Sequence, residues 1–447
     1  MHPLLKWHWL PALVFCGGLL GACQAYAAQT DAAHTDAAEL AAIRIEIVAL
    51  KAQYTTLLGT LEQRLQRAER QLAAQPKAPL PIVNPPSSAS ALNPATSLVL
   101  IGNYAALSRD PEDFAIPGFS LPSGAGPGVR GFSLGESELT LSANVDDLFY
   151  ASMTTSLSVE AGETLINLEE AYFQTLAMPV GLTLKGGRFF SRVGYLNEQH
   201  PHADDFVDRP LAYQVLLNGT LGDDGAQLRW LAPLDQFLEF GAEAYRGDAY
   251  PAHGAASYGV GTYTAFAHLG DDLGRSWSYR VGASYVHAAA QERATGSLPE
   301  VFTGRSELAI ADAVFKWAPN GNPTQTHLTL QAEYLQRWED GQLNAATYEG
   351  TQYGFYLQAV YQFMPRWRIG IRADGLFADN PGFGFTGTAL DDLGHDPRRA
   401  SLLLEFDHSD FSRLRMQYSY GEVGLRPDHQ LFLNYIHSLG AHGAHQF

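Results

Sequence analysis

The stretch QYGFYLQAVYQF, residues 352–363, decides the fold because its side chains alternate with a period of two. Its odd-numbered residues are Tyr, Phe, Leu, Ala, Tyr and Phe, whereas three of its six even-numbered residues are Gln. Successive side chains of a β-strand point to opposite faces, so one face of this strand is apolar and the other is largely polar. The apolar face carries aromatic residues at both ends, as the interface girdles of membrane barrels do. The stretch therefore predicts a strand of a transmembrane β-barrel.

The same alternation recurs along the chain from residue 97 onward, for example in WSYRVGASYV (277–286) and THLTLQAEYLQRW (326–338). We count about sixteen such segments, an even number as bacterial barrels require. Tight turns such as NVDD and MPR alternate with longer connections, the asymmetry typical of an outer-membrane barrel. Residues 97–447 are therefore predicted to form an all-β, antiparallel transmembrane β-barrel. The expected long connections are residues 108–130, 191–224, 247–259, 290–304, 339–350 and 379–398.

Composition agrees with this fold class and excludes others. Only 17% of the 447 residues are charged, 11% are aromatic, and no run after residue 30 is long and apolar enough for a transmembrane helix. The formal net charge of −18 argues against a nucleic-acid partner, which would require a basic surface to neutralise phosphates. It permits a preference for cations.

The first residues are predicted to direct export. Residues 1–27 contain an apolar segment followed by Ala25-Tyr26-Ala27, a small-residue cleavage site, and are interpreted as a signal peptide. The alternative is a lipid attached at Cys23, which lies in a lipobox-like sequence. Both cysteines of the chain lie in this segment, so cleavage after Ala27 would leave none. That suits passage through an oxidising periplasm.

A helix is expected in residues 38–75, where apolar residues recur in alternating steps of four and three. This spacing predicts a periplasmic coiled coil about 55 Å long, whose isoleucine content leans toward three strands. A solitary solvated helix is the alternative. Residues 76–96, rich in Pro, Ser and Ala, are interpreted as an extended linker.

The segment GGRFFSRVGYLNEQHPHADDFVDRPL, residues 186–211, carries a resemblance to a known family. It is similar to the strand-five and loop-three region of porins of the phosphate-selective O/P type, which also have a coiled coil before a trimeric sixteen-stranded barrel. The chain also resembles proteins labelled zinc-regulated or TonB-dependent receptors, but no plug domain precedes the barrel. The barrel has more acidic than basic residues, which argues against phosphate as the solute. The matching positions are Gly187, Phe189, Gly194, Leu196, Phe206, Asp208, Arg209 and Leu211.

The connection NEQHPHADDFVDRP, residues 197–210, is the third outer connection in chain order and is expected to fold into the barrel as a constriction. Two histidines at i and i+2 share a side of an extended chain, so a metal site is the alternative for the same segment. Its predicted ligands are His200, His202, Asp204 and Asp205. The predicted constriction residues are Arg192, Glu198, His200, His202, Asp208 and Arg209.

Charged residues at the polar positions of the alternating pattern are predicted to line the pore. Arginines gather on strands near the C-terminus and glutamates on strands across the barrel, an arrangement that would create a transverse field. The alternative is that these charges pair across neighbouring strands. The predicted lining residues are Glu136, Glu138, Glu239, Glu243, Arg368, Arg372, Glu405, Asp407, Arg413 and Arg415.

Together, these expectations predict an outer-membrane porin that passes small hydrophilic solutes or ions by diffusion, with no cofactor and no catalysis. The alternative is a metal uptake or binding receptor that captures zinc; a barrel phospholipase is less favoured. The motifs GFSLG (131–135) and GFGFTG (382–387) resemble enzyme fingerprints but lack the strand-to-helix context that such motifs require. Expected partners are outer-membrane lipid and lipopolysaccharide, two further copies of the chain in a homotrimer, and the barrel-assembly machinery, which would recognise the last strand ending in Phe447. No nucleic-acid partner is expected.

Overall fold

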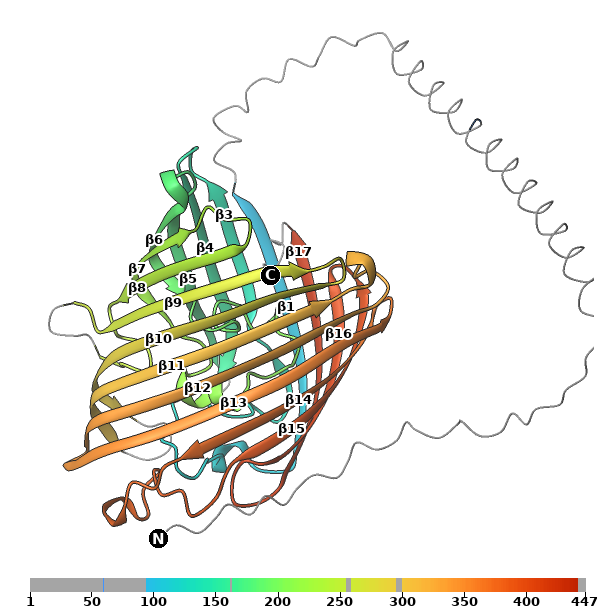
Figure 1. Cartoon of the computed structure of the whole chain (residues 1–447). Coiled ribbons are helices and arrows are strands. Elements are labelled where there is room, and N and C mark those ends of the chain that lie inside the picture. Colours follow the sequence, from blue (N-terminus) through green and yellow to red (C-terminus); the bar gives the residue numbers. More distant parts are fainter. Residues whose placement is uncertain (1–58, 60–93, 161–162, 255–258, 295–299, 441–447) are drawn as a thin grey trace, which may run out of the picture. The chain divides into compact units, whose positions relative to one another are not determined.

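The computed structural model describes Gly59 and residues 94–160, 163–254, 259–294 and 300–440 (Figure 1). The chain divides into two units, Met1–Pro85 and Pro86–Phe447, and the second contains all of the β-structure described. The predicted signal peptide, the coiled coil apart from Gly59, most of the linker and the terminal Phe447 lie outside the described residues. The predictions for these segments remain predictions.

The second unit is an antiparallel β-barrel whose sheet has 17 strands. The alternating segments that the sequence predicts all fall on these strands. The strands are β1 (Ala95–Leu107), β2 (Gly131–Leu134), β3 (Ser137–Asn144), β4 (Phe149–Glu160), β5 (Glu163–Thr175), β6 (Leu182–Phe190), β7 (Gly222–Leu231), β8 (Phe237–Tyr245), β9 (Thr262–Leu273), β10 (Trp277–Ala294), β11 (Val301–Trp317), β12 (His327–Leu343), β13 (Ala346–Met364), β14 (Trp367–Ala378), β15 (Arg398–Ser409), β16 (Ser412–Glu422) and β17 (Asp428–Gly440).

The barrel closes because β1 pairs with the last strand on one side and with β2 and β3 on the other. β2 and β3 are two parts of one wall strand, interrupted at Gly135 and Glu136, where the backbone N–H of Gly135 still donates to the carbonyl of Ile101. Counting them as one leaves 16 positions in the wall. The even number predicted from the sequence is therefore confirmed.

The connections at the two ends of the barrel differ in length. The end reached by β1 at Ala95 carries tight turns, among them residues 145–148 and 365–366, and is here named the turn end. The opposite loop end carries long connections at residues 108–130, 191–221 and 379–397. Two expected long connections are wrong. β12 and β13 are joined by residues 344–345 alone, and β10 and β11 extend well into the segment 290–304.

The reason for this difference is the length of four strands. β10, β11, β12 and β13 contain 18, 17, 17 and 19 residues. A tilted membrane strand needs about 9–11 residues, so these strands run beyond an apolar layer of ordinary thickness. Their distal parts are polar, like the loops that were predicted there, but they keep their backbone pairing. The polarity of the sequence therefore did not indicate where these strands end.

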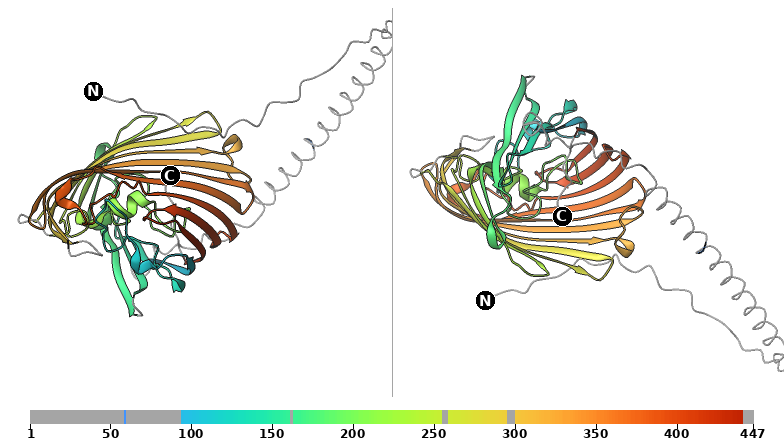
Figure 2. Two further views of the ribbon diagram at one scale, coloured as in Figure 1. Left: turned by 90° about the horizontal axis from the view of Figure 1, so that it is seen from below. Right: turned by 90° about the horizontal axis from the view of Figure 1, so that it is seen from above.

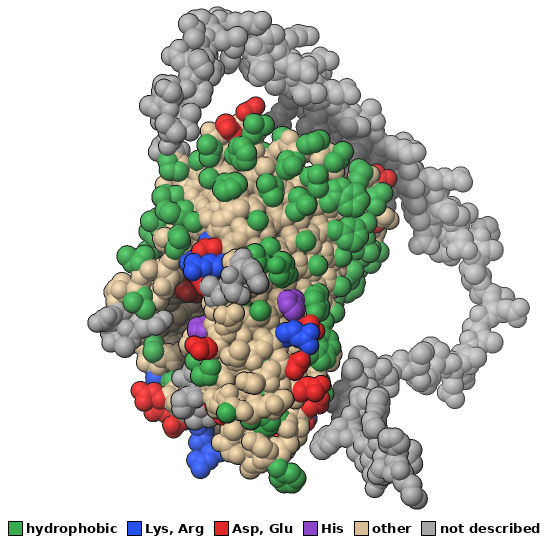
Figure 3. All heavy atoms as spheres, turned by 90° about the vertical axis from the view of Figure 1, so that its left-hand side faces the viewer, with side chains coloured by type: hydrophobic (Ala, Val, Ile, Leu, Met, Phe, Trp, Pro, Cys, Tyr) green, Lys and Arg blue, Asp and Glu red, His purple; other side chains and the backbone are tan. Residues whose placement is uncertain are grey.

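Apolar and polar side chains alternate between the two faces of the wall as predicted from the sequence. In β13, Leu357 is 55% exposed on the outer surface, whereas Tyr356 and Gln358 are buried in the interior. Figure 3 shows hydrophobic side chains over much of the wall, with charged side chains gathered toward the lower end of the view. Among the described residues, no helix is both long enough and apolar enough to cross a membrane. The described helices are short: α3 (Leu211–Leu216) and 3-10 turns at Pro111–Asp113, Pro179–Gly181, Pro319–Gly321 and Phe383–Phe385.

Candidate functional site

The connection between β6 and β7, residues 191–221 and here named loop three, lies inside the ring of strands (Figure 2). It contains α3, whose six residues are all buried. α3 contacts β12, β13 and β14, which are far from β6 and β7 in the order of strands. Loop three therefore crosses the interior of the barrel.

A side-chain clasp joins the two ends of loop three. The Asn197 side-chain amide donates to the carbonyls of Ser191 and Leu221, both at 2.8 Å, and its oxygen accepts from the Leu221 backbone N–H at 2.7 Å. Glu243 of β8 accepts from the Ser191 hydroxyl and from the backbone N–H of Arg192. An amide side chain can donate and accept at once, which is why one buried Asn can hold both ends. Glu243, predicted to line the pore, is thus an anchor of loop three.

Glu333 of β12 holds the middle of loop three. Its carboxylate accepts from the backbone N–H groups of Tyr195 and Leu196, both at 3.1 Å, and from the hydroxyls of Tyr213 and Tyr356. Gly194 has φ of +69°, and a side chain there would collide with the Glu333 carboxylate and the Tyr213 hydroxyl. Glycine is therefore required for both the backbone conformation and the close approach to the wall.

An apolar core fills the interior on the β10–β14 side. α3 has the sequence LAYQVL, and its apolar side chains pack against inward-facing apolar residues of five neighbouring strands. Burial of such side chains stabilises the loop by roughly 25 cal/mol per Å² removed from water. This half of the interior is packed like the core of a soluble domain. The residues of the wall that take part are Val286, Leu308, Ile310, Leu335, Tyr356 and Leu376.

Arginines of β16 bind the backbone of loop three. Arg415 donates to the carbonyls of Asp204 at 2.6 Å and Phe206 at 3.2 Å, and its Nε donates to Asn434 at 2.9 Å. Arg413 donates to the carbonyls of His202 and Asp204. Buried carbonyl groups need donors, and a guanidinium supplies several in one plane. Both arginines therefore satisfy the loop's backbone.

Asp208 pairs with two further arginines. Its carboxylate lies 2.7 Å from Arg372 and 2.6 Å from Arg399, and it accepts a hydrogen bond from Gln417 at 2.7 Å. Burial alone would raise the pKa of Asp208, but the two guanidinium groups and the hydrogen bonds outweigh it and lower that pKa to about 2. Asp374 pairs with the same arginines and accepts from the Leu211 backbone N–H. Loop three is thus ionically fixed to β14 and β15.

Several of the charges predicted to create a field across the pore pair with near neighbours in the structure. Arg368 pairs with Glu405 directly across the β14–β15 register and with Asp205 of loop three. Together with the contacts above, the arginine wall is neutralised locally because loop three lies against it. The alternative of local pairing therefore describes these charges. The predicted lining residues that are buried are Glu138, Glu239, Glu243, Arg372, Glu405 and Arg415; Arg368, Arg413 and Asp407 are partly exposed, and Glu136 is exposed.

The two histidines of loop three meet glutamates of β3 and β5. His200 Nδ1 lies 3.1 Å from carboxylate oxygens of both Glu138 and Glu169, and its Nε2 lies 3.1 Å from Glu170. His202 Nδ1 lies 2.8 Å from the other oxygen of Glu138. Burial would lower the pKa of His200, but the three carboxylates outweigh it and raise that pKa well above its usual value. This group is here named the His–Glu cluster.

Of the predicted metal ligands, the structure brings together the two histidines but not the two aspartates. Asp204 pairs with Arg209 at 2.7 Å and Asp205 with Arg368 at 2.9 Å, so neither joins the histidines. Burial raises the pKa of Asp204 to about 6 despite the neighbouring arginines. A short sequence separation does not bring side chains together when an ordered loop directs them to different partners.

The other half of the interior is polar. Arg192 of loop three lies 2.7 Å from Glu198 and 3.2 Å from Glu239 of β8, which also pairs with Arg229 of β7. Lys185 of β6 lies over the ring of Tyr172, 4.0 Å from its centroid. With the His–Glu cluster, these side chains form what is here named the polar half. Several are partly exposed, with 13% of the Arg192 and 19% of the Glu198 side chain accessible.

Sequence reasoning missed Glu169, Glu170 and Glu333. Glu333 lies at a polar position of the alternating pattern, so its inward position could be predicted. Its hydrogen-bond partners could not, because they are distant in the sequence. Glu169 and Glu170 are consecutive, so at most one should face inward in a regular strand. The register shifts between Thr154 and Thr155 of β4, an irregularity that allows both carboxylates to reach His200. No sequence signal marks that shift.

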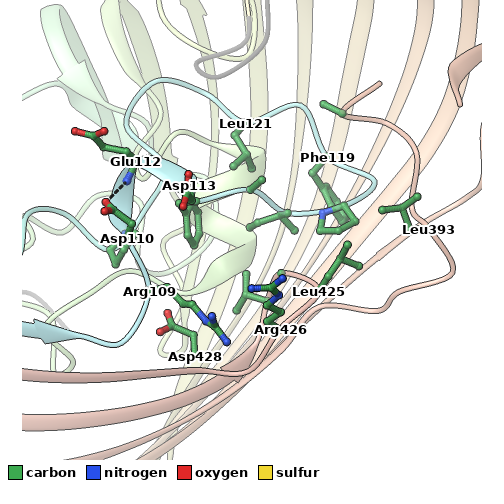
Figure 4. A pocket seen from close by; sticks show the side chains of 18 of the residues that line it. Arg109, Asp110, Glu112, Asp113, Phe119, Leu121, Leu393, Leu425, Arg426 and Asp428 are labelled. Carbon is green, nitrogen blue, oxygen red and sulfur yellow. Dashed lines mark hydrogen bonds between the residues drawn. The ribbon is translucent and has the colours of Figure 1, made fainter. Parts of the chain in front are cut away.

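A cavity of about 600 Å³ opens at the loop end. It is lined by loop one (residues 108–130) and by the β14–β15 and β16–β17 connections. Figure 4 shows charged side chains, among them Arg109, Asp110 and Asp428, beside apolar ones such as Leu121 and Leu425. We name this cavity the vestibule.

The closed wall, the apolar outer face and the inserted loop define a barrel of the kind found in solved outer-membrane proteins. OmpT of Vibrio cholerae, in the trimer form of the in-vitro folded protein, is similar with a TM-score of 0.50 and 8% identity, covering 77% of this chain and 99% of that chain. A loop L8 deletion mutant of OmpT gives a TM-score of 0.50 at 10% identity, with 77% and 99% covered. At these identities the likeness shows the fold.

In sequence, the chain is 30% identical over 440 residues to an uncharacterized protein of Aquifex aeolicus (strain VF5), covering 90% of this chain and 88% of that protein. The chain therefore belongs to the family of that protein. No protein-family model matches the sequence. The narrower resemblance to phosphate-selective porins remains a prediction.

Proposed function

We propose that the chain is an outer-membrane porin through which small hydrophilic solutes or ions diffuse passively, with loop three as its constriction. The observation that carries this proposal is the division of the interior by loop three. Apolar residues pack tightly on the β10–β14 side, whereas the side facing β3–β8 has polar and charged side chains that are partly accessible. A solute path needs wetted polar walls. The path therefore runs off-centre, through the polar half.

The vestibule is the entrance to this path. It lies at the loop end, which faces the outside of the cell when the tight turns are periplasmic. Solutes would enter between loop one and the β14–β15 connection, pass His200, Glu198 and Arg192, and leave at the turn end. Loop three selects by size and by charge, and no chemical step is required.

Single-channel recording from the purified chain in planar bilayers tests the proposal. The expected result is stepwise, ohmic conductance that scales with electrolyte concentration. A chain that is folded, as judged by β-sheet circular dichroism and heat-modifiable migration, yet shows no conductance would overturn the proposal. Solute-induced swelling of proteoliposomes then gives the size limit.

A homotrimer is part of the same proposal. The trimer form of OmpT has a similar barrel, and the heptad pattern of residues 38–75 favours three strands. Mass photometry of the full chain in detergent, compared with a chain lacking residues 38–75, tests both elements. A monomer in both cases would contradict the trimer and leave the conductance test intact.

A further inference from the structure

The His–Glu cluster joins three elements that are distant in the chain. Glu138 comes from β3, Glu169 from β5 and His200 from loop three. One ligand atom from each lies within 4.8 Å of the others, and His200 Nδ1 is 3.1 Å from both carboxylates. In a tetrahedral zinc site with bonds of about 2.0–2.2 Å, neighbouring ligand atoms are roughly 3.3–3.6 Å apart. The three atoms therefore need only small shifts to hold one ion.

The cluster also has supporting contacts of the kind that orient metal ligands. Glu138 uses its second oxygen to bind His202 Nδ1 at 2.8 Å. His200 uses its second nitrogen, Nε2, to meet Glu170, which also accepts from the backbone N–H of Phe190 at 3.2 Å. Partners of this sort fix the ring orientation and the carboxylate position of a ligand before the ion arrives.

The cluster is open on one side. The side chain of His200 is 18% exposed and that of Glu169 is 10% exposed, whereas Glu138 is 2% exposed. Three protein ligands with one accessible side leave a position for water, as in three-ligand zinc sites. One imidazole and two carboxylates suit zinc and similar transition metals better than calcium or magnesium, which prefer oxygen ligands alone.

We propose that Glu138, Glu169 and His200 form a binding site for one divalent transition-metal ion, which links loop three to β3 and β5. The ion would sit in the polar half, add two positive charges there and fix the loop to the wall. Its effect on permeation rests on the proposed porin function. Occupancy would lower the conductance of cations past loop three. Binding itself does not depend on that function.

Titration of the purified full-length chain with Zn²⁺ tests the site, with a chromophoric chelator reporting free metal. Glu169→Gln keeps the shape of the side chain but removes a charged ligand, and His200→Ala removes the nitrogen. The matched control is His287→Ala, whose histidine lies 3.5 Å from Glu307 on strand positions outside the cluster. We expect one bound equivalent fewer in both cluster variants than in the wild type and in His287→Ala. Equal binding in all four proteins would overturn the site.

Two further measurements separate the possible failures. Co²⁺ bound to the wild type is expected to give visible absorption bands of a nitrogen–oxygen site that are missing in Glu169→Gln; identical spectra would count against the ligand set. Micromolar Zn²⁺ is expected to lower the conductance of the wild type and of His287→Ala but not of Glu169→Gln. Specific binding with unchanged conductance would overturn the effect on permeation alone. If no protein conducts, the porin proposal fails and the titration still decides the site.

Discussion

The hydroxyl of Tyr213 in α3 donates a hydrogen bond to Glu333 of β12, with 2.8 Å between the two oxygens. The two residues are 120 positions apart. This contact connects loop three to a wall strand, and the same carboxylate accepts two backbone N–H groups of the loop. Glu333 is therefore a central attachment of loop three to β12, since it accepts from three groups of the loop.

Replacing Glu333 should loosen loop three. Glu333→Gln provides one neutral oxygen and a surplus NH₂ where four donors converge, so several buried donors lose their acceptor. Each such loss costs about 1–3 kcal/mol. We expect a lower temperature for loss of the heat-modifiable folded form and frequent conductance fluctuations in single channels. Gln336→Glu, at a non-buried position on the same strand, serves as the control; quiet channels in Glu333→Gln would argue against the attachment.

Gly194 should tolerate no side chain. Gly194→Ala combines a left-handed backbone with a collision against Glu333 and Tyr213, and we expect destabilisation of at least about 1 kcal/mol. Gly102→Ala, on β1, has open space around the added carbon and no positive φ, so it is expected to behave as the wild type. Thermal transitions of the two variants measured side by side give the answer. Equal stability would mean that loop three adjusts freely at Gly194.

Attachment through Asp208 should depend on acid pH. The pKa of Asp208 is lowered from 3.8 to about 2 by Arg372 and Arg399, so its contribution is present above pH 4 and is lost as the pH falls toward 2. The shift corresponds to about 2 kcal/mol. We expect Asp208→Asn to be less stable than the wild type at pH 7, with the difference shrinking below pH 4. A difference that stays constant down to pH 2 would contradict this assignment.

The off-centre path predicts where thiol reagents can react. Cys16 and Cys23 precede the expected cleavage site, so the processed chain offers no background thiol. Tyr150→Cys, on the polar side of β4, is expected to react with a charged methanethiosulfonate and to reduce conductance. Leu308→Cys lies in the apolar core at 1% exposure and is expected to stay unmodified. The reverse pattern of reactivity would place the path on the other side of loop three.

The polar half should favour cations. Its acidic side chains Glu138, Glu169, Glu170, Glu198 and Glu239 outnumber the basic Lys185, Arg192, Arg229 and His200. In a KCl gradient we therefore expect a reversal potential on the cation side. Glu198→Gln, at a partly exposed position, should reduce that potential, whereas Glu307→Gln, at a wall position away from this group, should not. Anion preference in the wild type would show that other charges control the path.

The strands could be predicted because the membrane imposes one rule on every residue of the wall. Each strand must show apolar side chains to lipid and can show polar ones inward, so the period of two is visible without knowledge of partners. The lengths of β12 and β13 could not be predicted, because polar residues beyond the membrane pair as well as apolar ones do.

Less of the candidate site than of the fold could be predicted from the sequence. The inward position of His200 and His202 followed from the order of connections, but their partners depended on which wall the loop touches. Asp204 and Asp205 looked suitable as ligands because they are close in sequence. Their carboxylates form ion pairs with Arg209 and Arg368 instead. Glu169 lies beside His200 because of an irregularity in β5, which amino-acid composition does not reveal.

Glu333, Arg413 and Arg415 hold loop three largely by its backbone, through N–H groups and carbonyls that every amino acid except proline carries in full. These backbone contacts therefore do not depend on which side chains the loop carries at those positions. Residues such as Glu198 and His200 can be exchanged while the attachment stays in place. Descendants of one ancestral barrel, or a protein engineer, could alter what passes by editing a few codons of the loop and leaving the scaffold untouched.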